Sequence, residues 1–295
     1  MTAVAVEALT KSYGQVEAVR AIDFAIETGE VVAILGPNGA GKTTTVEMIE
    51  GYRRPDRGRI EVLGHDPGQR DRSWLDRVGI VLQEGGMEEE LTVEEAVAAQ
   101  SRPYSSPLPV DEVVATVGLA EKRGSRIKSL SGGQRRRLDL ALAIVGDPDL
   151  LFLDEPTTGF DPAARRNSWE AIKRLAEQGT TVVLTTHYLE EAQELANRVI
   201  VMTDGRIVAN GAPDDLGDRR AGTSTIGFRV DPARAHELGV PSDGSGRVEL
   251  ETDEPVKTIH GITDRALRAG IELTGLEVRR LTLEEAYLRL VTPDE

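Results

Sequence analysis

The hydrophobic positions of this chain change their period along its length. Apolar and polar residues alternate in short stretches over residues 3–35, which predicts a small antiparallel sheet. Apolar residues then recur at helical spacing between 78 and 145, which predicts a mostly helical insertion. Uninterrupted apolar runs return at 150–153 and 180–184, separated by a predicted helix at 162–178, and such runs are typical of buried parallel strands. An α/β core is the simplest structure with this order of elements.

A second, smaller domain is predicted after a Gly- and Asp-bearing linker at 214–222. Beyond it the pattern predicts strands at 225–230, 247–251 and 272–279 and helices at 256–269 and 283–290. The last helix begins with a capping box, Thr282-x-x-Glu285. We therefore expect a large first domain at 1–215 and a small α+β domain at 222–295.

A glycine-rich loop separates the apolar run 31–35 from the helix that follows it. It matches G-x-x-x-x-G-K-[ST], and its residues are Gly36, Pro37, Asn38, Gly39, Ala40, Gly41, Lys42, Thr43 and Thr44. Such a loop binds the phosphates of a nucleotide through backbone N–H groups and the positive end of the helix. We expect Lys42 to reach the β- and γ-phosphates and the Thr43 hydroxyl to bind Mg2+. The loop predicts binding of a nucleoside triphosphate.

The bulk composition disfavours several other classes of protein. The net charge of -15 opposes general association with nucleic-acid backbones. The chain has no cysteine, which excludes disulfides and thiolate metal sites. No apolar run approaches the roughly 18 residues that cross a bilayer, and Glu7 and Asp23 stand where a signal peptide would be apolar. We expect neither a transmembrane segment nor a signal peptide, and no nucleic-acid partner.

Further motifs accompany the phosphate loop in a fixed order. Tyr13 precedes it, and after it come Gln83, the run Leu130-Ser131-Gly132-Gly133-Gln134, Asp154-Glu155, Gly159-Phe160-Asp161 and His187. With these motifs the chain resembles the ATP-binding cassette (ABC) ATPases over about residues 3–215. The run at 130–134 is the discriminating signature, because other phosphate-loop families lack it. The resemblance implies an α/β P-loop NTPase core with an N-terminal antiparallel β subdomain and a helical subdomain at about 84–148.

Two carboxylates at the end of the apolar run 150–153 have distinct predicted roles. Asp154 ends the strand, where a buried carboxylate needs a partner, and Mg2+ held through water would supply one. Glu155 is expected to face the γ-phosphate and to take a proton from the attacking water. The resemblance assigns Glu155 the same role of general base.

Three further residues complete the predicted site. His187 closes an apolar strand, and its imidazole can hydrogen-bond the γ-phosphate and hold Glu155 and the water in line. The resemblance implies that the amide oxygen of Gln83 completes the Mg2+ shell. Tyr13 fits the family's aromatic platform for the adenine ring, a stacking contact worth about 1–3 kcal/mol. ATP rather than GTP is the nucleotide that the resemblance implies.

The signature predicts that the chain acts as a dimer. Ser131, Gly132 and Gly133 open a helix, and a helix start is a second place for an anion. In the family, each ATP lies between the phosphate loop of one chain and the signature of the other, so one chain holds two half-sites. Asp161 would lie at the same joint and couple the halves. The resemblance therefore implies a homodimer or heterodimer of ATP-binding subunits.

The resemblance also implies a separate transmembrane permease subunit that the dimer moves, and a place on the cytoplasmic face of the cell membrane. In the family, the loop after Gln83 docks a short helix of the permease. Here that loop carries Glu88, Glu89 and Glu90, which suggests a basic docking helix, although a solvated loop fits the sequence equally well.

Two stretches, 131–141 and 157–162, look like the daunorubicin-type efflux ATPases of the drug-resistance branch of bacterial ABC exporters. The segment from about 222, with its ending at 283–288, resembles the small accessory domain of that branch, which we expect to stabilise or restrain the dimer. This favours an ATPase subunit that powers efflux of a drug-like or other small hydrophobic molecule. Export of lipid or polysaccharide is the alternative within the same class.

Two other classes share the phosphate loop. A soluble ABC ATPase that acts on the ribosome or on nucleic acid usually has two cassettes, a long coiled-coil insertion or zinc-binding cysteines, and this sequence has one cassette and no cysteine. A regulatory subunit that no longer hydrolyses ATP is disfavoured by the intact Lys42, Asp154, Glu155 and His187.

Overall fold

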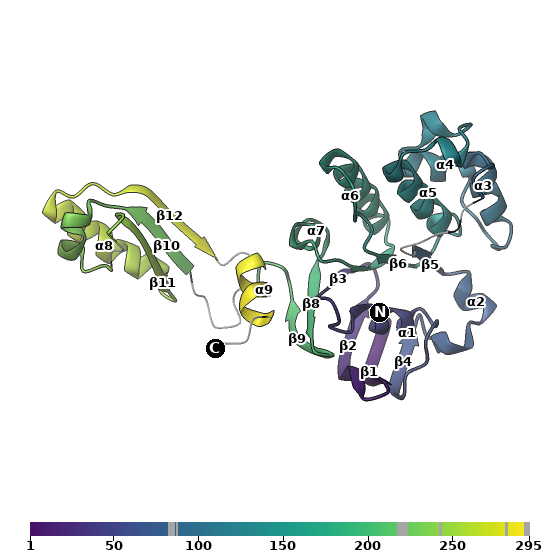
Figure 1. Cartoon of the computed structure of the whole chain (residues 1–295), viewed down its shortest axis with the longest axis horizontal. Helices are drawn as coiled ribbons and strands as arrows, with labels where there is room; N and C mark the ends of the chain where they lie inside the picture. The colour runs from purple at the N-terminus through teal and green to yellow at the C-terminus, as the bar shows by residue number, and fades with distance from the viewer. Residues whose placement is uncertain (82–85, 87, 217–223, 242–243, 281–282, 292–295) are drawn as a thin grey trace. The chain divides into compact units, whose positions relative to one another are not determined.

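Two units make up the chain, Met1–Ala212 and Pro213–Glu295, and each is described by itself. The computed structural model describes residues 1–295 apart from 82–85, 87, 217–223, 242–243, 281–282 and 292–295 (Figure 1). Most of the predicted linker at 214–222 lies outside the described residues. Thr282 of the predicted capping box also lies outside them.

A six-stranded sheet forms the centre of the first unit. Its strand order is β5-β6-β7-β3-β8-β9, and all neighbours are parallel except β8 and β9. The strands are β3 (Val31–Leu35), β5 (Val78–Val81), β6 (Leu150–Asp154), β7 (Thr181–Thr185), β8 (Arg198–Thr203) and β9 (Arg206–Gly211). The predicted parallel α/β core is confirmed, and β3, which leads into the phosphate loop, lies in its interior.

A smaller antiparallel sheet, with the order β2-β1-β4, faces the central sheet. Its strands are β1 (Thr2–Tyr13), β2 (Val16–Glu27) and β4 (Arg57–Val62). The predicted antiparallel subdomain is confirmed for β1 and β2, whereas β4 comes from a later part of the chain than the alternating stretch from which the sheet was predicted.

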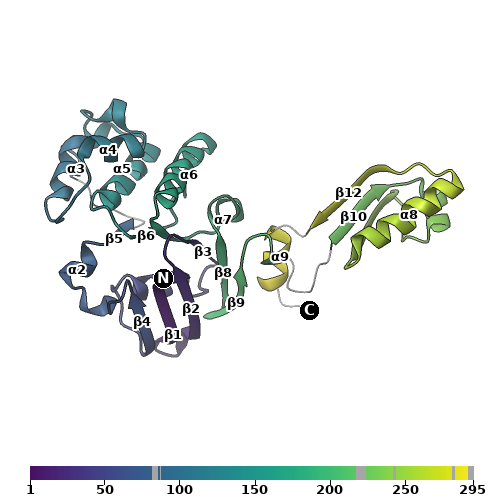
Figure 2. The ribbon, with the colours of Figure 1, turned by 180° about the vertical axis from the view of Figure 1, so that it is seen from behind.

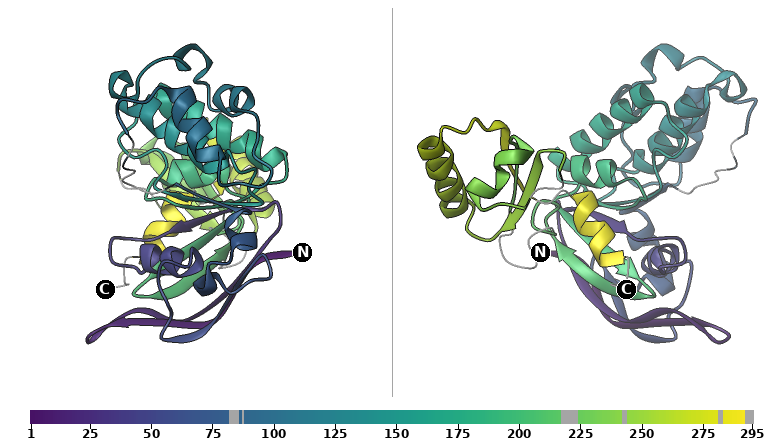
Figure 3. Two further views of the ribbon diagram at one scale, coloured as in Figure 1. Left: turned by 90° about the vertical axis from the view of Figure 1, so that its right-hand side faces the viewer. Right: turned by 60° about the vertical axis from the view of Figure 1, so that its left-hand side comes forward.

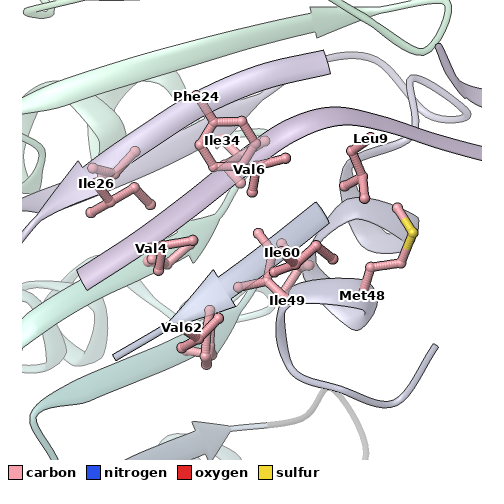
Figure 4. Packing of buried hydrophobic residues seen from close by; sticks show 14 of the residues in the cluster. Val4, Val6, Leu9, Phe24, Ile26, Ile34, Met48, Ile49, Ile60 and Val62 are labelled. Carbon is pink, nitrogen blue, oxygen red and sulfur yellow. The ribbon is translucent and has the colours of Figure 1, made fainter. Parts of the chain in front are cut away.

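The main core lies between these two sheets and around helix α1 (Lys42–Ile49), as Figure 4 shows. Val4, Phe24 and Ile60 from the small sheet meet Ile34 of β3 and Met48 of α1 there. The alternate residues of β3 are buried on the opposite face, over which helices α6 (Pro162–Glu177) and α7 (Leu189–Leu195) lie (Figures 1 and 2). Burial on both faces explains why these strands are uninterrupted apolar runs.

A group of helices at one end of the central sheet forms the predicted helical subdomain. It contains α3 (Val93–Ser101), α4 (Val110–Thr116) and α5 (Gly132–Ile144), which contact one another, with the single-turn α2 (Arg72–Leu75) before β5. Short 3-10 segments, η2 (Ala120–Lys122) and η3 (Ile127–Ser129), connect α4 to α5, and η1 (Pro67–Gln69) follows β4. Because α5 also contacts β5, this subdomain is attached to the edge of the sheet.

The second unit is a three-stranded antiparallel sheet with the order β11-β10-β12. Helix α8 covers one face of it, as Figure 3 shows, and Ile226, Phe228, Val248, Ile262 and Ala266 form its core. The elements are β10 (Ser224–Arg229), η5 (Pro232–Leu238), β11 (Arg247–Thr252), α8 (Pro255–Ala269), β12 (Thr274–Arg280) and α9 (Leu283–Val291). The predicted α+β character is confirmed.

The carboxyl group of Glu50, directly after α1, makes folding stability dependent on pH. Its side chain is 2% exposed, and its Oε1 has no hydrogen-bond partner within the described structure. Burial, and then the charges of Asp154 and Glu47, raise the pKa of Glu50 from its ordinary 4.5 to about 8. The folded state therefore keeps a proton that the unfolded state releases, and stability falls as the pH rises from 4.5 through 8.

Replacing Glu50 with glutamine should remove this dependence. We expect Glu50→Gln to raise the free energy of unfolding at pH 8.5 by about 2–4 kcal/mol, and to change it far less at pH 5. Urea unfolding of the nucleotide-free chain at both pH values measures the difference. The same change at both pH values would show that Glu50 is charged in the folded protein.

Candidate functional site

The phosphate loop is built where only glycine fits. Gly41 caps α1 with φ 97°, and a Cβ on it would lie 2.3 Å from the carbonyl oxygen of Ala18. A Cβ on Gly36, directly after β3, would lie 2.3 Å from the carbonyl oxygen of Met202 on β8. The loop is therefore packed closely against β2 and β8, which holds its backbone N–H groups at the start of α1.

The ammonium group of Lys42 is buried and bonded to neutral groups. Its Nζ donates to the carbonyl oxygens of Gly36 at 2.7 Å and Pro37 at 3.1 Å, and the residue is 8% exposed. Burial lowers the pKa of Lys42, and the charges of Glu155 and Asp154 oppose that shift. A buried cation whose hydrogen-bond partners among the described residues are carbonyl groups is well suited to receive a triphosphate, whose charge would compensate its own.

Asp154 and Thr185 lie side by side because β6 and β7 pair in parallel with these residues in register. The Thr185 hydroxyl donates to Oδ1 of Asp154, and both residues line the cavity that Thr43 also lines. A hydroxyl and a carboxylate that face one cavity are the hard oxygen donors that Mg2+ prefers, so these residues fit that ion. Gln83, the third predicted ligand, lies outside the described residues.

Glu155 turns sharply away from the strand and meets His187. It has φ 46°, an uncommon conformation for a residue with a side chain, and its N–H donates to the carbonyl oxygen of Thr185 at 3.1 Å. Its Oε1 lies 3.3 Å from Nδ1 of His187, and its Oε2 accepts from the Thr158 hydroxyl at 3.1 Å. The structure thus brings the predicted general base, Glu155, next to His187, which is predicted to hold it in line, from two adjacent strand ends.

Residues of the phosphate loop line a cavity of about 490 Å3, together with Asp154, Glu155 and Tyr13. Tyr13 lies at the end of β1, is 42% exposed and has the guanidinium of Arg53 at 5.2 Å from its ring centre. A cavity of this size suits a nucleotide. The predicted adenine platform is therefore at the same cavity as the predicted phosphate site.

The signature folds as a capping box at the start of α5. The Ser131 hydroxyl accepts from the N–H of Gln134 at 3.3 Å, and Oε1 of Gln134 accepts from the N–H of Ser131 at 3.0 Å. These bonds leave the N–H groups of Gly132 and Gly133 at an ordered helix start. The spacing Ser-x-x-Gln would have revealed this box in the sequence.

A second depression, of about 470 Å3, lies at the signature. Ser131, Gly132 and Gly133 line it together with Phe160 and Asp161. Asp161 caps α6, accepting from the N–H groups of Ala163 and Ala164 at 2.9 Å each. Among the described residues, the two hollows share no lining residue, so one chain presents the phosphate loop and the signature at separate places.

Arg136 connects the signature helix to the carboxylates, a contact that sequence reasoning missed. Its guanidinium donates to the main-chain oxygens of Asp154 at 2.8 Å and Glu155 at 3.3 Å. Nothing in the sequence distinguishes it from its neighbours Arg135 and Arg137, because the contact depends on how α5 packs beside β6.

The negative charges of Glu89 and Glu90, in the loop after Gln83, are paired with basic side chains of the same chain. Glu89 pairs with Arg135 at 2.8 Å, and Glu90 pairs with Arg126 at 3.0 Å and Lys128 at 2.7 Å. Two of the three carboxylates that suggested a basic docking helix therefore already have cationic partners.

The fold, the phosphate loop and the signature define an ATP-binding cassette. The sequence model of the ABC transporter family matches residues 19–158. Daunorubicin resistance ATP-binding protein DrrA3 of Streptomyces coeruleorubidus is 37% identical over 99% of this chain and 97% of its own length. Nod factor export ATP-binding protein I of Rhizobium etli is 41% identical over 98% of this chain and 93% of its own length. The chain belongs to the ABC transporter family.

Solved structures agree with this assignment. An ATP-binding subunit of an ABC transporter has a TM-score of 0.65 and 27% identity, covering 72% of this chain and 91% of its own. A dimeric ATP-binding cassette bound to ADP and Pi in a post-hydrolysis state has a TM-score of 0.63 and 26% identity, covering 71% of this chain and 98% of its own. The protein is the ATP-binding and ATP-hydrolysing subunit of an ABC exporter.

Membership of the family also indicates which kinds of protein this chain binds. ATP-binding subunits of ABC transporters work with membrane permeases and dimerise. Within the described part of this chain, no helix combines the length and the apolar character that crossing a bilayer requires. The names of the relatives favour an exporter over a soluble ATPase of the ribosome or nucleic acid.

Removing the buried ammonium group should weaken nucleotide binding. We expect Lys42→Ala to lower the affinity for Mg-ATP by roughly tenfold to a hundredfold, because charge-assisted bonds to the phosphates are lost. Isothermal titration calorimetry of the full chain measures this, and circular dichroism checks that the variant is folded. Undiminished affinity in a folded variant would contradict the assignment of this loop.

Proposed function

We propose that two ATP-binding subunits, either two copies of this chain or this chain and a relative, close head to tail over two ATP molecules. The observation that carries the proposal is the separation of the phosphate-loop cavity from the signature depression. Each open half-site offers backbone N–H groups at a helix start to an anion. A phosphate chain held by both would bind the two subunits together, and hydrolysis would release them.

Within each site, the roles follow from the contacts of the side chains. Lys42 neutralises the β- and γ-phosphates, and Glu155 takes the proton of the attacking water, while His187 holds Glu155 and the γ-phosphate in line. Thr43, Asp154 and Gln83 would hold Mg2+, which when bound supplies positive charge next to the phosphates. Tyr13 stacks on the adenine ring, and Asp161 couples the two sites.

We assign the docking of the permease to a groove between the central sheet and the helical subdomain. The groove, of about 380 Å3, is lined by Tyr52, Val78 and Ile80 on one side and Gln100 and Tyr104 on the other. Tyr52 is 53% exposed, with the Arg70 guanidinium 4.6 Å from its ring centre. Strand β5 supplies part of the wall, and Gln83 follows this strand by two residues in the sequence, so a helix docked here would be coupled to the nucleotide site through β5.

The cargo is proposed to be a drug-like or other small hydrophobic molecule that leaves the cell through the permease. Relatives named for daunorubicin resistance and for Nod factor export are similar to this chain over nearly its whole length. Such a protein would lie at the cytoplasmic face of the membrane, held there by the permease. Reconstitution of chain and permease in vesicles, followed by ATP-dependent accumulation of daunorubicin, tests the proposal, and ATP turnover without transport would argue against this cargo.

Replacing the general base should separate hydrolysis from binding. We expect Glu155→Gln to lower turnover by roughly 100- to 10,000-fold while ATP affinity stays unchanged, because only the proton acceptor is lost. Steady-state ATPase assays and calorimetry measure the two quantities, and size-exclusion chromatography with ATP should show a longer-lived dimer. Full turnover in the variant would disprove the assignment.

A charge in the groove should weaken docking. We expect Tyr52→Asp to reduce copurification with the permease partner by roughly tenfold or more, because an aromatic contact is replaced by a desolvated charge. ATP binding by the isolated chain should not change. A matched control is Leu267→Asp, since Leu267 is an 83% exposed apolar residue outside the groove. Equal losses in both variants would contradict the assignment of the groove.

A further inference from the structure

Glu191 is a buried carboxylate that none of the motifs includes. It lies on α7 and is 0% exposed. Its Oε1 accepts from the Thr157 hydroxyl at 2.6 Å and from the indole Nε1 of Trp169 at 3.0 Å. Its Oε2 is buried with no hydrogen-bond partner in the part of the chain that the structure describes.

The partners of Glu191 belong to the segments that carry the predicted catalytic residues. Thr157 stands two residues after Glu155, and Trp169 lies on α6, the helix that Asp161 caps. Helix α7, which carries Glu191, begins two residues after His187. Through these two hydrogen bonds, Oε1 of Glu191 connects the segment that carries His187 to the segment that runs from Glu155 through Asp161 into α6. We call this connection the tie.

Burial makes this tie different from the other polar links between α6 and α7. Arg165 pairs with Glu190 at 3.5 Å, and Lys173 pairs with Glu194, but these pairs lie at the surface, where ion pairs contribute little. A buried acceptor with two donors cannot be replaced by water without opening the packing, so its geometry is well defined.

We infer that Glu191 is a positioning residue for ATP hydrolysis, because it holds His187 in place at Glu155. The inference rests on the roles proposed above for Glu155 and His187, whose side chains lie 3.3 Å apart. Glu191 acts only through them, since it is not among the residues that line the nucleotide cavity. Without the tie, α7 can shift relative to the segment after β6, and the alignment of His187 and Glu155 is lost.

Two substitutions at this position separate hydrogen bonding from packing. Glu191→Gln keeps an oxygen that accepts from both Thr157 and Trp169. Glu191→Leu keeps the approximate volume and leaves both donors buried without an acceptor. A role that needs only volume would tolerate leucine, whereas the positioning role needs the acceptor.

The experiment compares kcat and KM of the full chain for ATP. We expect Glu191→Leu to lower kcat by roughly tenfold to a hundredfold with KM unchanged, because small displacements of catalytic groups have effects of that size. Glu191→Gln should restore kcat to within about threefold of the unchanged protein. A kcat equal to that of the unchanged protein in a folded Glu191→Leu variant, or equal losses in both variants, would overturn the inference.

A matched pair of tryptophan variants covers the case in which Glu191→Leu does not fold. Trp169→Phe removes one donor to Glu191 and should lower kcat, whereas Trp74→Phe should not, because the buried Nε1 of Trp74 has no partner in the described structure. Equal kcat values in these two variants would also overturn the inference.

A His187→Ala background distinguishes this inference from the proposed function. If Glu191 acts through His187, adding Glu191→Leu to His187→Ala lowers kcat little further. An undiminished additional loss would show that Glu191 acts by another route. Full turnover of Glu155→Gln or His187→Ala alone would instead disprove the proposed roles of those residues.

Discussion

The parallel pairing of β3, β6 and β7 is the constraint on which the nucleotide site depends. Parallel strands end at the same edge of the sheet, so the phosphate loop after β3, Asp154 at the end of β6 and Thr185 at the end of β7 converge there. Burial of these strands on both faces excludes a slip in register, because a slip would place polar strand ends in the core. The geometry of the site is thus a consequence of core packing.

Close packing of backbone on backbone sets the position of the loop within that edge. The carbonyl oxygens of Ala18 and Met202 lie where side chains on Gly41 and Gly36 would be. This packing fixes the position of the loop, and the Lys42 ammonium group donates to two carbonyl groups within it. In the proposed complex, a triphosphate would give this ammonium group charged partners in place of neutral ones.

The signature lies at a depression of its own, which is the feature that supports the proposed head-to-tail pairing of two subunits. The capping box of Ser131 and Gln134 and the cap formed by Asp161 order two helix starts around a depression that is separate from the phosphate-loop cavity. Arg136 joins the signature helix to the backbone of Asp154 and Glu155, and Glu191 joins the segments on the other side. The proposed hydrolytic residues and the proposed contact with a facing subunit therefore lie on the same few segments.

The sequence by itself determined the elements and their chemistry. The loop from Gly36 to Thr44, the signature at 131–134 and the apolar runs before Asp154 and His187 are local patterns, and local patterns reflect backbone and burial requirements that act within a few residues. Only the tertiary structure decided the contacts of Arg136 with β6, the tie of Glu191 to Thr157 and Trp169, the joining of β4 to the small sheet, and the neutralisation of Glu89 and Glu90. Each of these joins residues distant in sequence, and their pairing depends on how helices and strands pack, which no single stretch of sequence encodes.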